Sequence, residues 1–272
     1  MRLFRFLVVL VFVLVAGVYA GFYFINQARV DQTIPEITFG TQVLEVPVDA
    51  DEAALLMDVK AVDEKDGDIT NRVIVEKISN FVEKGLSNIT YAVVDSDRHT
   101  VKKTRRVRYI DYRSPRFTFS RPMRFDVGTN FNILQALGAV DMIDGDISDK
   151  VKLIGSDLSV NAPGTYMMQA QVTNSKGDVS YLRFNVTMKP AQRLALQVNL
   201  TDYLVYLKQG EALNTRAYME EVTLNSQPVT EYTVDISPDI DTAFPGVYQA
   251  VYKVSDGRGN TGETELTVIV EE

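Results

Sequence analysis

Hydrophobic and polar positions alternate in three similar stretches of the chain, which begin at Gly85, Gly164 and Gly246. Residues at even steps after each glycine are mostly apolar, and those at odd steps are more polar. This period of two is typical of a β-strand with one buried face. The three glycines are 79 and 82 residues apart, which is the size of a small domain. The pattern therefore predicts three similar β modules in tandem.

A turn-rich segment and a second alternating stretch follow each of these strands. The turns read DSDRH, NSKGD and DGRGN, and such residues tolerate left-handed backbone conformations. Strand, tight turn and strand predict a hairpin, and several short strands of this kind predict a β-sandwich. The third module carries the longest stretch of possible helix, around 213–222. We place the modules at 34–112, 115–190 and 193–272.

Short joints separate the modules, and each contains a proline, Pro115 in the first and Pro190 in the second. Proline fixes one backbone dihedral and stiffens a connection. The joints therefore favour an end-to-end rod over independently tumbling modules.

The N-terminal segment, residues 1–27, has a different pattern. Arg2 and Arg5 precede an uncharged run at 6–25, FLVVLVFVLVAGVYAGFYFI. Twenty helical residues span about 30 Å, the thickness of the hydrocarbon core of a bilayer. The arginines predict a cytoplasmic N-terminus and extracytoplasmic modules, joined through a polar tether at 26–33. A cleavable signal peptide ending at Ala20 is the alternative, and it places the modules on the same side.

Composition limits the remaining chemistry. The chain has no cysteine, so disulfides and thiolate metal sites are excluded. Its net charge of −8 argues against general nucleic-acid binding. We find no HExxH motif, nucleophile elbow, phosphate loop or Rossmann fingerprint, and we expect no cofactor. His99 is the only histidine and has no obvious carboxylate partner in the sequence, so we expect a surface residue.

Three motifs carry a resemblance to a known family. Modules one and two contain DGDIT at Asp66 and DGDIS at Asp144, module two contains PGTY, and module three contains FPGVYQAVYKVSDGRGNTGE. These residues resemble the bacterial immunoglobulin-like repeats of cell-surface proteins. The resemblance implies immunoglobulin-like β-sandwiches. Together with the apolar run at 6–25, the predicted fold is all-β, with three tandem immunoglobulin-like β-sandwiches after one N-terminal transmembrane helix. It also implies an adhesive, spacer or binding role in the cell envelope. Module one departs from the pattern at 97–99, so the resemblance does not predict the conformation of its hairpin turn.

The DGD elements also raise the question of calcium. Calcium binds six to eight oxygen atoms, commonly from carboxylates spaced one residue apart. Asp63, Asp66 and Asp68 meet this loosely, as do Asp141, Asp144 and Asp146. Asp-Gly is also a frequent turn dipeptide for backbone reasons alone. We favour turn chemistry because module three has lost DGD and kept its hairpin.

Basic residues are concentrated at 98–124, which contains ten Lys and Arg residues and one acidic residue. In the repeat register, Lys103 and Arg105 occupy the positions of Leu182 and Phe184. Arginine pairs well with phosphate and carboxylate groups, so the region is a candidate site for an anionic polymer. An edge strand protected by charge is the alternative. The candidate ligand-binding residues are Lys102, Lys103, Arg105, Arg106, Arg108, Arg113 and Arg116.

Together these observations predict a non-enzymatic protein of the bacterial cell envelope. It would be held in the lipid bilayer by residues 6–25, as a single-pass protein of the cell membrane. The extracytoplasmic stalk would present module three to an envelope or surface protein. The alternative function is binding of an anionic polysaccharide through 98–124.

Overall fold

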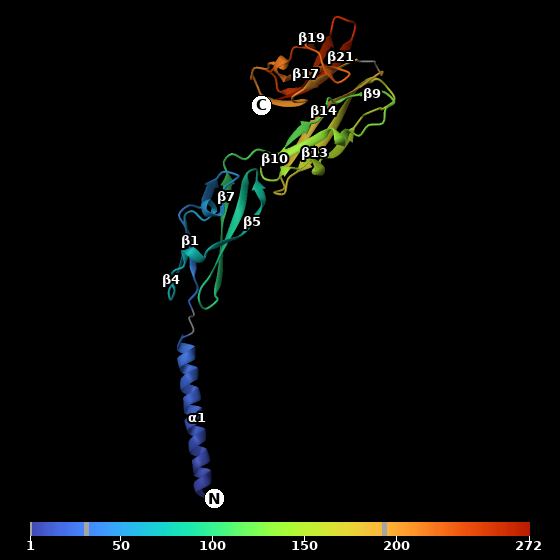
Figure 1. The fold of residues 1–272 in the computed structure, drawn as a ribbon. Coiled ribbons are helices and arrows are strands. Elements are labelled where there is room, and N and C mark those ends of the chain that lie inside the picture. Colours follow the sequence, from blue (N-terminus) through green and yellow to red (C-terminus); the bar gives the residue numbers. More distant parts are fainter. Residues whose placement is uncertain (1, 30–32, 192–194) are drawn as a thin grey trace. The chain divides into compact units, whose positions relative to one another are not determined.

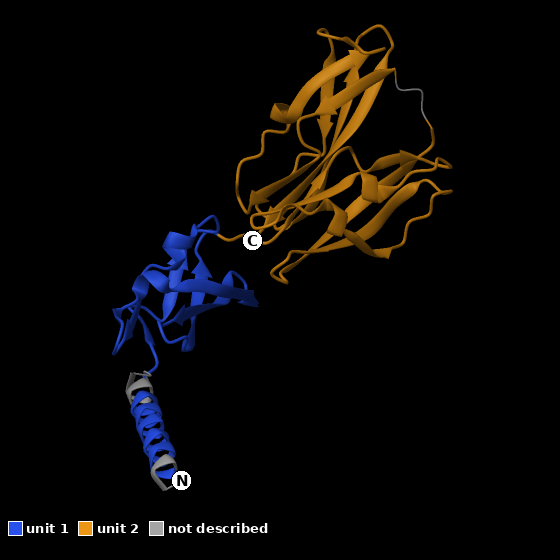
Figure 2. Cartoon of the chain, turned by 60° about the horizontal axis from the view of Figure 1, so that its bottom comes forward, with its two compact units in different colours: residues 1–111 blue, residues 112–272 orange. Residues whose placement is uncertain are grey.

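The computed structural model describes residues 2–29, 33–191 and 195–272 (Figure 1). The chain divides into two compact units, residues 1–111 and residues 112–272 (Figure 2). The division falls in the predicted joint between modules one and two. Residues 30–32 of the predicted tether, residue 192 of the second joint and residues 193–194 of predicted module three lie outside the described residues.

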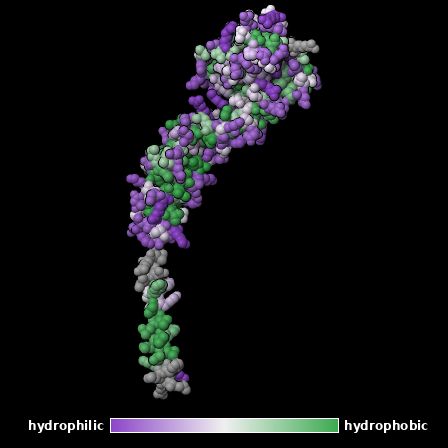
Figure 3. Space-filling view, in the orientation of Figure 1, coloured by the Kyte–Doolittle hydropathy of each residue, from purple (hydrophilic) through white to green (hydrophobic). Residues whose placement is uncertain are grey.

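A single helix, α1 (Arg2–Arg29), contains the apolar run. Its stretch Arg5–Phe24 is long and apolar enough to cross a membrane. Figure 3 shows apolar side chains along this part of the helix and a mixture of polar and apolar side chains on the surface of the modules. The helix ends two residues later than we predicted, so residues 26–29 are helical instead of forming a tether.

The β part of the first unit consists of two sheets around one core. Apolar side chains from both sheets, such as Ile37, Ile89 and Val107, form that core. A short helix, α2 (Glu52–Leu55), and a 3-10 turn, η1 (Thr70–Arg72), connect strands. One sheet has the order β1 (Glu36–Phe39), β3 (Val59–Asp63) and β4 (Gly67–Asp68). The other has the order β2 (Val43–Val46), β7 (Thr100–Tyr109), β6 (Leu86–Val94) and β5 (Ile74–Glu83).

The second unit repeats this arrangement twice, each time with one three-stranded and one four-stranded sheet. In module two, the three-stranded sheet has the order β8 (Arg116–Phe119), β10 (Leu137–Asp141) and β11 (Gly145–Asp146). The four-stranded sheet has the order β12 (Lys152–Ser156), β13 (Gly164–Thr173), β14 (Val179–Lys189) and β9 (Arg124–Asp126). In module three, the three-stranded sheet has the order β15 (Leu196–Leu200), β17 (Met219–Leu224) and β18 (Gln227–Pro228). The four-stranded sheet has the order β16 (Leu204–Lys208), β21 (Thr261–Glu271), β20 (Gly246–Ser255) and β19 (Thr233–Ser237). The 3-10 turns are η2 (Ile133–Gln135), η3 (Ser148–Lys150) and η4 (Thr215–Tyr218). The all-β prediction is confirmed.

The three predicted hairpins are present as antiparallel pairs, β6–β7, β13–β14 and β20–β21. Their pairing also confirms the repeat register. Arg105 lies opposite Ile89 in the first hairpin, and Phe184 lies opposite Met168 in the second. Arg105 therefore occupies a position that module two fills with a buried phenylalanine.

Two tyrosines are hydrogen-bonded to the backbone just before their own strands. The hydroxyl of Tyr166 donates to the carbonyl of Ala162 at 3.0 Å, and that of Tyr248 donates to the carbonyl of Phe244 at 2.8 Å. A tyrosine bonded to backbone a few residues upstream is the tyrosine corner of β-sandwiches.

The helix predicted at 213–222 is wrong. Only Thr215–Tyr218 forms a 3-10 turn, and β17 begins at Met219. β17 pairs with β15, which buries Val222 against Val198 and Val254. Tertiary pairing of a short amphipathic segment overrides its local helix preference.

Modules two and three contact each other inside the second unit. Leu204 of β16 belongs to the core of module two, and Tyr203, Tyr206 and Ile269 pack against that core. The hydroxyl of Tyr206 accepts the backbone N–H of Phe117 at 3.1 Å. These side-chain contacts join the two modules directly, in addition to the short linker that the sequence indicated.

Candidate functional site

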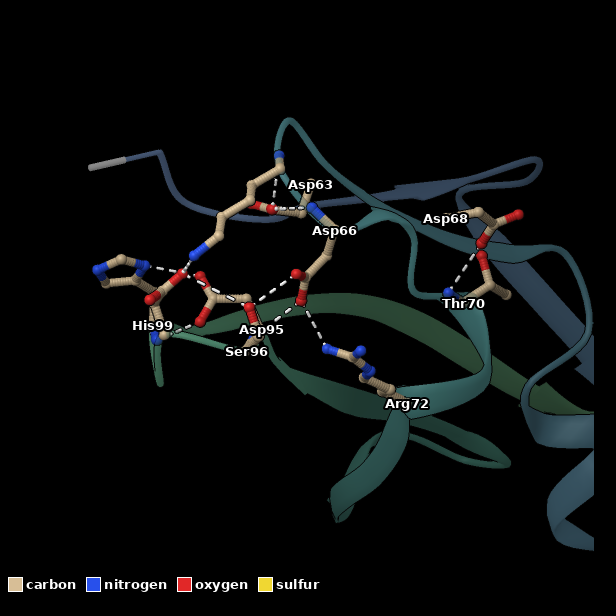
Figure 4. Close-up of polar contacts among 10 residues, drawn as sticks. Asp63, Asp66, Asp68, Thr70, Arg72, Asp95, Ser96 and His99 are labelled. Carbon is tan, nitrogen blue, oxygen red and sulfur yellow. Dashed lines mark hydrogen bonds and ion pairs between the residues drawn. The ribbon is translucent and has the colours of Figure 1, made fainter. Parts of the chain in front are cut away.

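The DGD element of module one closes a tight turn between β3 and β4 (Figure 4). Asp63 accepts the backbone N–H groups of Lys65 at 3.0 Å and Asp66 at 2.8 Å through one carboxylate oxygen. Gly67 has a φ of 72°, which glycine adopts without strain. Asp68 accepts the N–H of Thr70, the first residue of η1, at 2.9 Å. Asp63 and Asp68 thus bind backbone N–H groups within this turn.

The third candidate, Asp66, joins this turn to the hairpin turn after β6. Its carboxylate accepts the Ser96 hydroxyl at 2.7 Å, the Ser96 N–H at 2.8 Å and the Arg72 guanidinium at 2.7 Å. The hydrogen bonds from Ser96, followed by the contribution of Arg72, lower the pKa of Asp66 below its ordinary value. Asp66 therefore fastens two turns of module one as an ionised side chain.

Module two repeats the arrangement. Asp141 accepts the N–H groups of Ile143 and Asp144, and Asp144 accepts both the N–H and the hydroxyl of Ser175. Within residues 33–191 and 195–272, no group of three or more His, Asp or Glu side chains is arranged to hold a metal ion. The recurring geometry supports the turn interpretation of DGD.

Acid is expected to weaken this turn in module two. Burial alone would raise the pKa of Asp144, but hydrogen bonds from Ser175 and Lys150 outweigh burial and lower it. The stability that a carboxylate of lowered pKa contributes is present above its unfolded pKa and is lost as pH falls through the folded pKa. We expect the melting temperature of the Asp144→Asn variant to fall less than that of wild type between about pH 5 and about pH 2. The exposed control Asp157→Asn should retain the full acid dependence.

One position distinguishes the turns of modules one and two. In module two, the amide of Asn174 donates to the second oxygen of Asp141 at 3.1 Å. In module one the matching residue is Asp95, which cannot donate, and the second oxygen of buried Asp63 has no hydrogen-bond partner among the described residues. Asp95 instead lies 2.6 Å from Nδ1 of His99. Our expectation of a histidine without a carboxylate partner is therefore wrong, although the i, i+4 spacing within a turn was the available signal.

The basic residues of β7 point alternately inward and outward. Lys103 and Arg105 face the other sheet of module one, where the Lys103 ammonium donates to the carbonyl of Ile37 at 2.6 Å. Lys102, Arg106 and Arg108 are exposed on the opposite face. Alternation of this kind follows from the strand itself. It divides the predicted basic region into two groups with different roles.

Arg105 is 3% exposed and fully engaged inside module one. Its guanidinium donates to the carbonyl of Met57 at 2.7 Å, and its Nε donates to the hydroxyl of Tyr91 at 3.0 Å. The same group lies 4.9 Å from the ring centroid of Phe39 and 5.3 Å from that of Tyr91. Aromatic faces and carbonyl groups offset the cost of burying the charge. Arg105 is therefore a core residue and cannot contact a polymer, contrary to our expectation.

The other predicted ligand-binding residues are divided between the two units. Lys102 forms an ion pair with Glu76. Arg113 and Arg116 belong to the second unit, where Arg116 pairs with Glu271 at 2.6 Å and lies 4.7 Å from the ring centroid of Tyr206. Arg106 and Arg108 have no hydrogen bond or ion pair from their side chains within the described parts of the chain. Of the candidates in the described first unit, only these two combine exposure with unoccupied guanidinium groups on one strand.

An ionic cluster that the sequence did not reveal lies where modules two and three meet. Glu263 of β21 pairs with Lys189 at 2.5 Å and with Arg124 at 3.3 Å. Glu265, which is 3% exposed, accepts the hydroxyl of Thr187 at 3.4 Å. Burial raises the pKa of Glu265, and the nearby Lys189 and Arg124 oppose that shift. The cluster fastens the two modules through charged groups that are largely withdrawn from solvent.

Comparisons with known proteins give distant similarities. No protein-family model matches the chain. It is 28% identical over 232 residues to the pesticidal crystal protein Cry22Aa of Bacillus thuringiensis, covering 79% of this chain and 30% of that protein. It is 25% identical over 143 residues to an uncharacterized 81.3 kDa protein of Acholeplasma phage L2, covering 51% and 19%. The chain spans less than a third of the length of these curated relatives.

Solved structures resemble the chain only weakly. The CBM51-2 and INT domains of Clostridium perfringens ZmpB match with a TM-score of 0.27 and 15% identity, over 53% of this chain and 39% of that one. Human CDH23 EC21-23 matches with a TM-score of 0.22 and 13% identity, over 87% of this chain and all of that one. Similarity at this level assigns no function to the chain.

Proposed function

We propose that this protein is a non-enzymatic, membrane-anchored stalk or adhesion protein of the bacterial cell envelope. In this proposal α1 crosses the cell membrane with its N-terminus in the cytoplasm. Three immunoglobulin-like β-sandwiches follow outside the membrane, and the most distal one contacts an envelope or surface protein.

One observation carries the proposal. A helix with exposed apolar side chains along Arg5–Phe24 precedes β modules that each bury a core of apolar side chains. Exposed apolar surface of this extent along one helix needs a lipid or protein environment. The two arginines before the span favour a cytoplasmic N-terminus.

The functional residues described above also favour a structural role. The turn carboxylates bind N–H groups, Arg105 supports the core of module one, and Glu263 fastens modules two and three. Such interactions stabilise the fold of the modules, and a spacer or display protein depends on a stable fold. The direct contact between modules two and three makes the distal part a single body suited to presenting a surface.

Membrane fractionation tests the anchor. We expect the full chain to remain in the membrane pellet after a carbonate wash and to be released by detergent. Deletion of residues 2–29 behind an added cleavable secretion signal should move the chain to the soluble fraction. A mature protein whose mass lacks residues 1–20 would contradict the anchor and favour a signal peptide.

A further inference from the structure

The outer face of the four-stranded sheet in module one carries an unusual set of polar side chains. Lys102, Thr104, Arg106 and Arg108 are all exposed on β7. Cross-strand neighbours lie on the same face of a sheet, and Asn88 lies opposite Arg106 while Thr90 lies opposite Thr104. The hydroxyl groups of Thr90 and Thr104 are 2.9 Å apart. We define the β7 face as Asn88, Thr90, Lys102, Thr104, Arg106 and Arg108.

Arg106 and Arg108 have no side-chain hydrogen bond or ion pair among the described residues, unlike several other Lys and Arg residues of the same unit. Lys103 and Arg105 donate to backbone carbonyls, Arg72 pairs with Asp66, and Lys65 pairs with Asp97. Glu45 on β2 is the register neighbour of Arg108, yet no ion pair joins them in the described part of the unit. Two adjacent guanidinium groups therefore face solvent in a chain whose net charge is −8.

The geometry of this face suits an extended anionic polymer. Arg106 and Arg108 are two residues apart on one strand, which separates their Cα atoms by about 7 Å. Guanidinium groups bind carboxylate and phosphate oxygens through paired hydrogen bonds. The neighbouring hydroxyl and amide groups can both donate and accept, as sugar hydroxyls require. The adjacent strands β6 and β7 present these groups on one face of the sheet.

We propose that the β7 face binds an anionic polysaccharide through Arg106 and Arg108, with Asn88, Thr90 and Thr104 contacting sugar hydroxyls. The charge complementarity of two unpaired arginines selects the anionic polymer as the occupant. The inner residues Lys103 and Arg105 take no part, because the fold of module one already occupies them. This role is additional to the anchored scaffold and does not depend on it.

Binding of the full chain in nanodiscs of neutral lipid tests the proposal. The probes are polygalacturonate, which carries carboxylates, a glycerol-phosphate teichoic acid, which carries phosphates, and neutral dextran as control. We expect binding to one or both anionic polymers, none to dextran, and weaker binding as NaCl rises from about 50 mM to about 200 mM. The two anionic arms identify which group is preferred.

Charge reversal on the β7 face is the decisive comparison. The Arg106→Glu, Arg108→Glu variant should bind at least about tenfold more weakly, and Arg106→Gln, Arg108→Gln should show an intermediate loss. The matched control Arg121→Glu, Arg258→Glu changes the charge equally on exposed residues of the second unit and should retain binding. Circular dichroism checks that each variant is folded. Equal loss in the control, unchanged binding in the β7 variants, absent wild-type binding, or equally tight binding to duplex DNA would overturn the proposal.

Discussion

Replacing Arg105 with alanine is expected to lower the free energy of unfolding of the first unit by about 3 kcal/mol. The substitution leaves the carbonyl of Met57 and the hydroxyl of Tyr91 without a buried donor. It also opens a cavity beside the ring of Phe39. Urea titration read by hydrogen exchange of β6 peptides measures the effect in the full chain, because it reports on the first unit separately.

Arg106→Ala is the matched control for this prediction. The two residues are adjacent on β7 and carry the same charge, but Arg106 faces solvent. We expect its substitution to change the free energy of unfolding by no more than about 0.5 kcal/mol. Similar effects of the two substitutions would contradict the assignment of Arg105 to the core.

Replacing Glu263 with alanine is expected to destabilise the second unit by about 3 kcal/mol. The side chains of Glu263 and Arg124 are only 11% and 9% exposed, so the substitution leaves a nearly buried guanidinium without its counter-charge. Lys189 loses the same partner. Calorimetry of the full chain should show the transition of the second unit at a lower temperature and that of the first unit unchanged.

Glu271→Ala serves as the control at the same junction. Its ion pair with Arg116 has side chains 42% and 41% exposed, so solvent screens the charges. We expect a loss below about 1 kcal/mol. Should Glu263→Ala prove equally mild, the cluster would be an ordinary surface contact and modules two and three would be less firmly joined.

The sequence was informative wherever one pattern dominates a segment. Alternation after Gly85, Gly164 and Gly246 located three hairpins, and the repeat register aligned Arg105 with Phe184 of module two, although we counted Arg105 among the ligand-binding candidates. The period of two decides which face of a strand is buried, so these predictions rest on geometry alone. The helix at 213–222 failed because pairing with β15 decides the conformation of a short segment.

The candidate site was less accessible to sequence analysis. The charge density of 98–124 suggested one basic patch, although strand alternation alone separates Lys103 and Arg105 from Lys102, Arg106 and Arg108. Whether a basic side chain already has a hydrogen-bond partner depends on residues distant in sequence, such as Met57 for Arg105 and Glu271 for Arg116. The local sequence pattern does not predict the ion pairs of Glu263, because its partners Arg124 and Lys189 come from another module.

The absence of cysteine from the chain permits a direct test of the anchored, extracytoplasmic arrangement. Single substitutions Leu3→Cys and Asp239→Cys place one thiol before the span and one on exposed surface of module three. A membrane-impermeant maleimide added to intact cells should label Asp239→Cys at once and label Leu3→Cys only after permeabilisation. Labelling of Leu3→Cys in intact cells, or protection of Asp239→Cys until permeabilisation, would contradict the account.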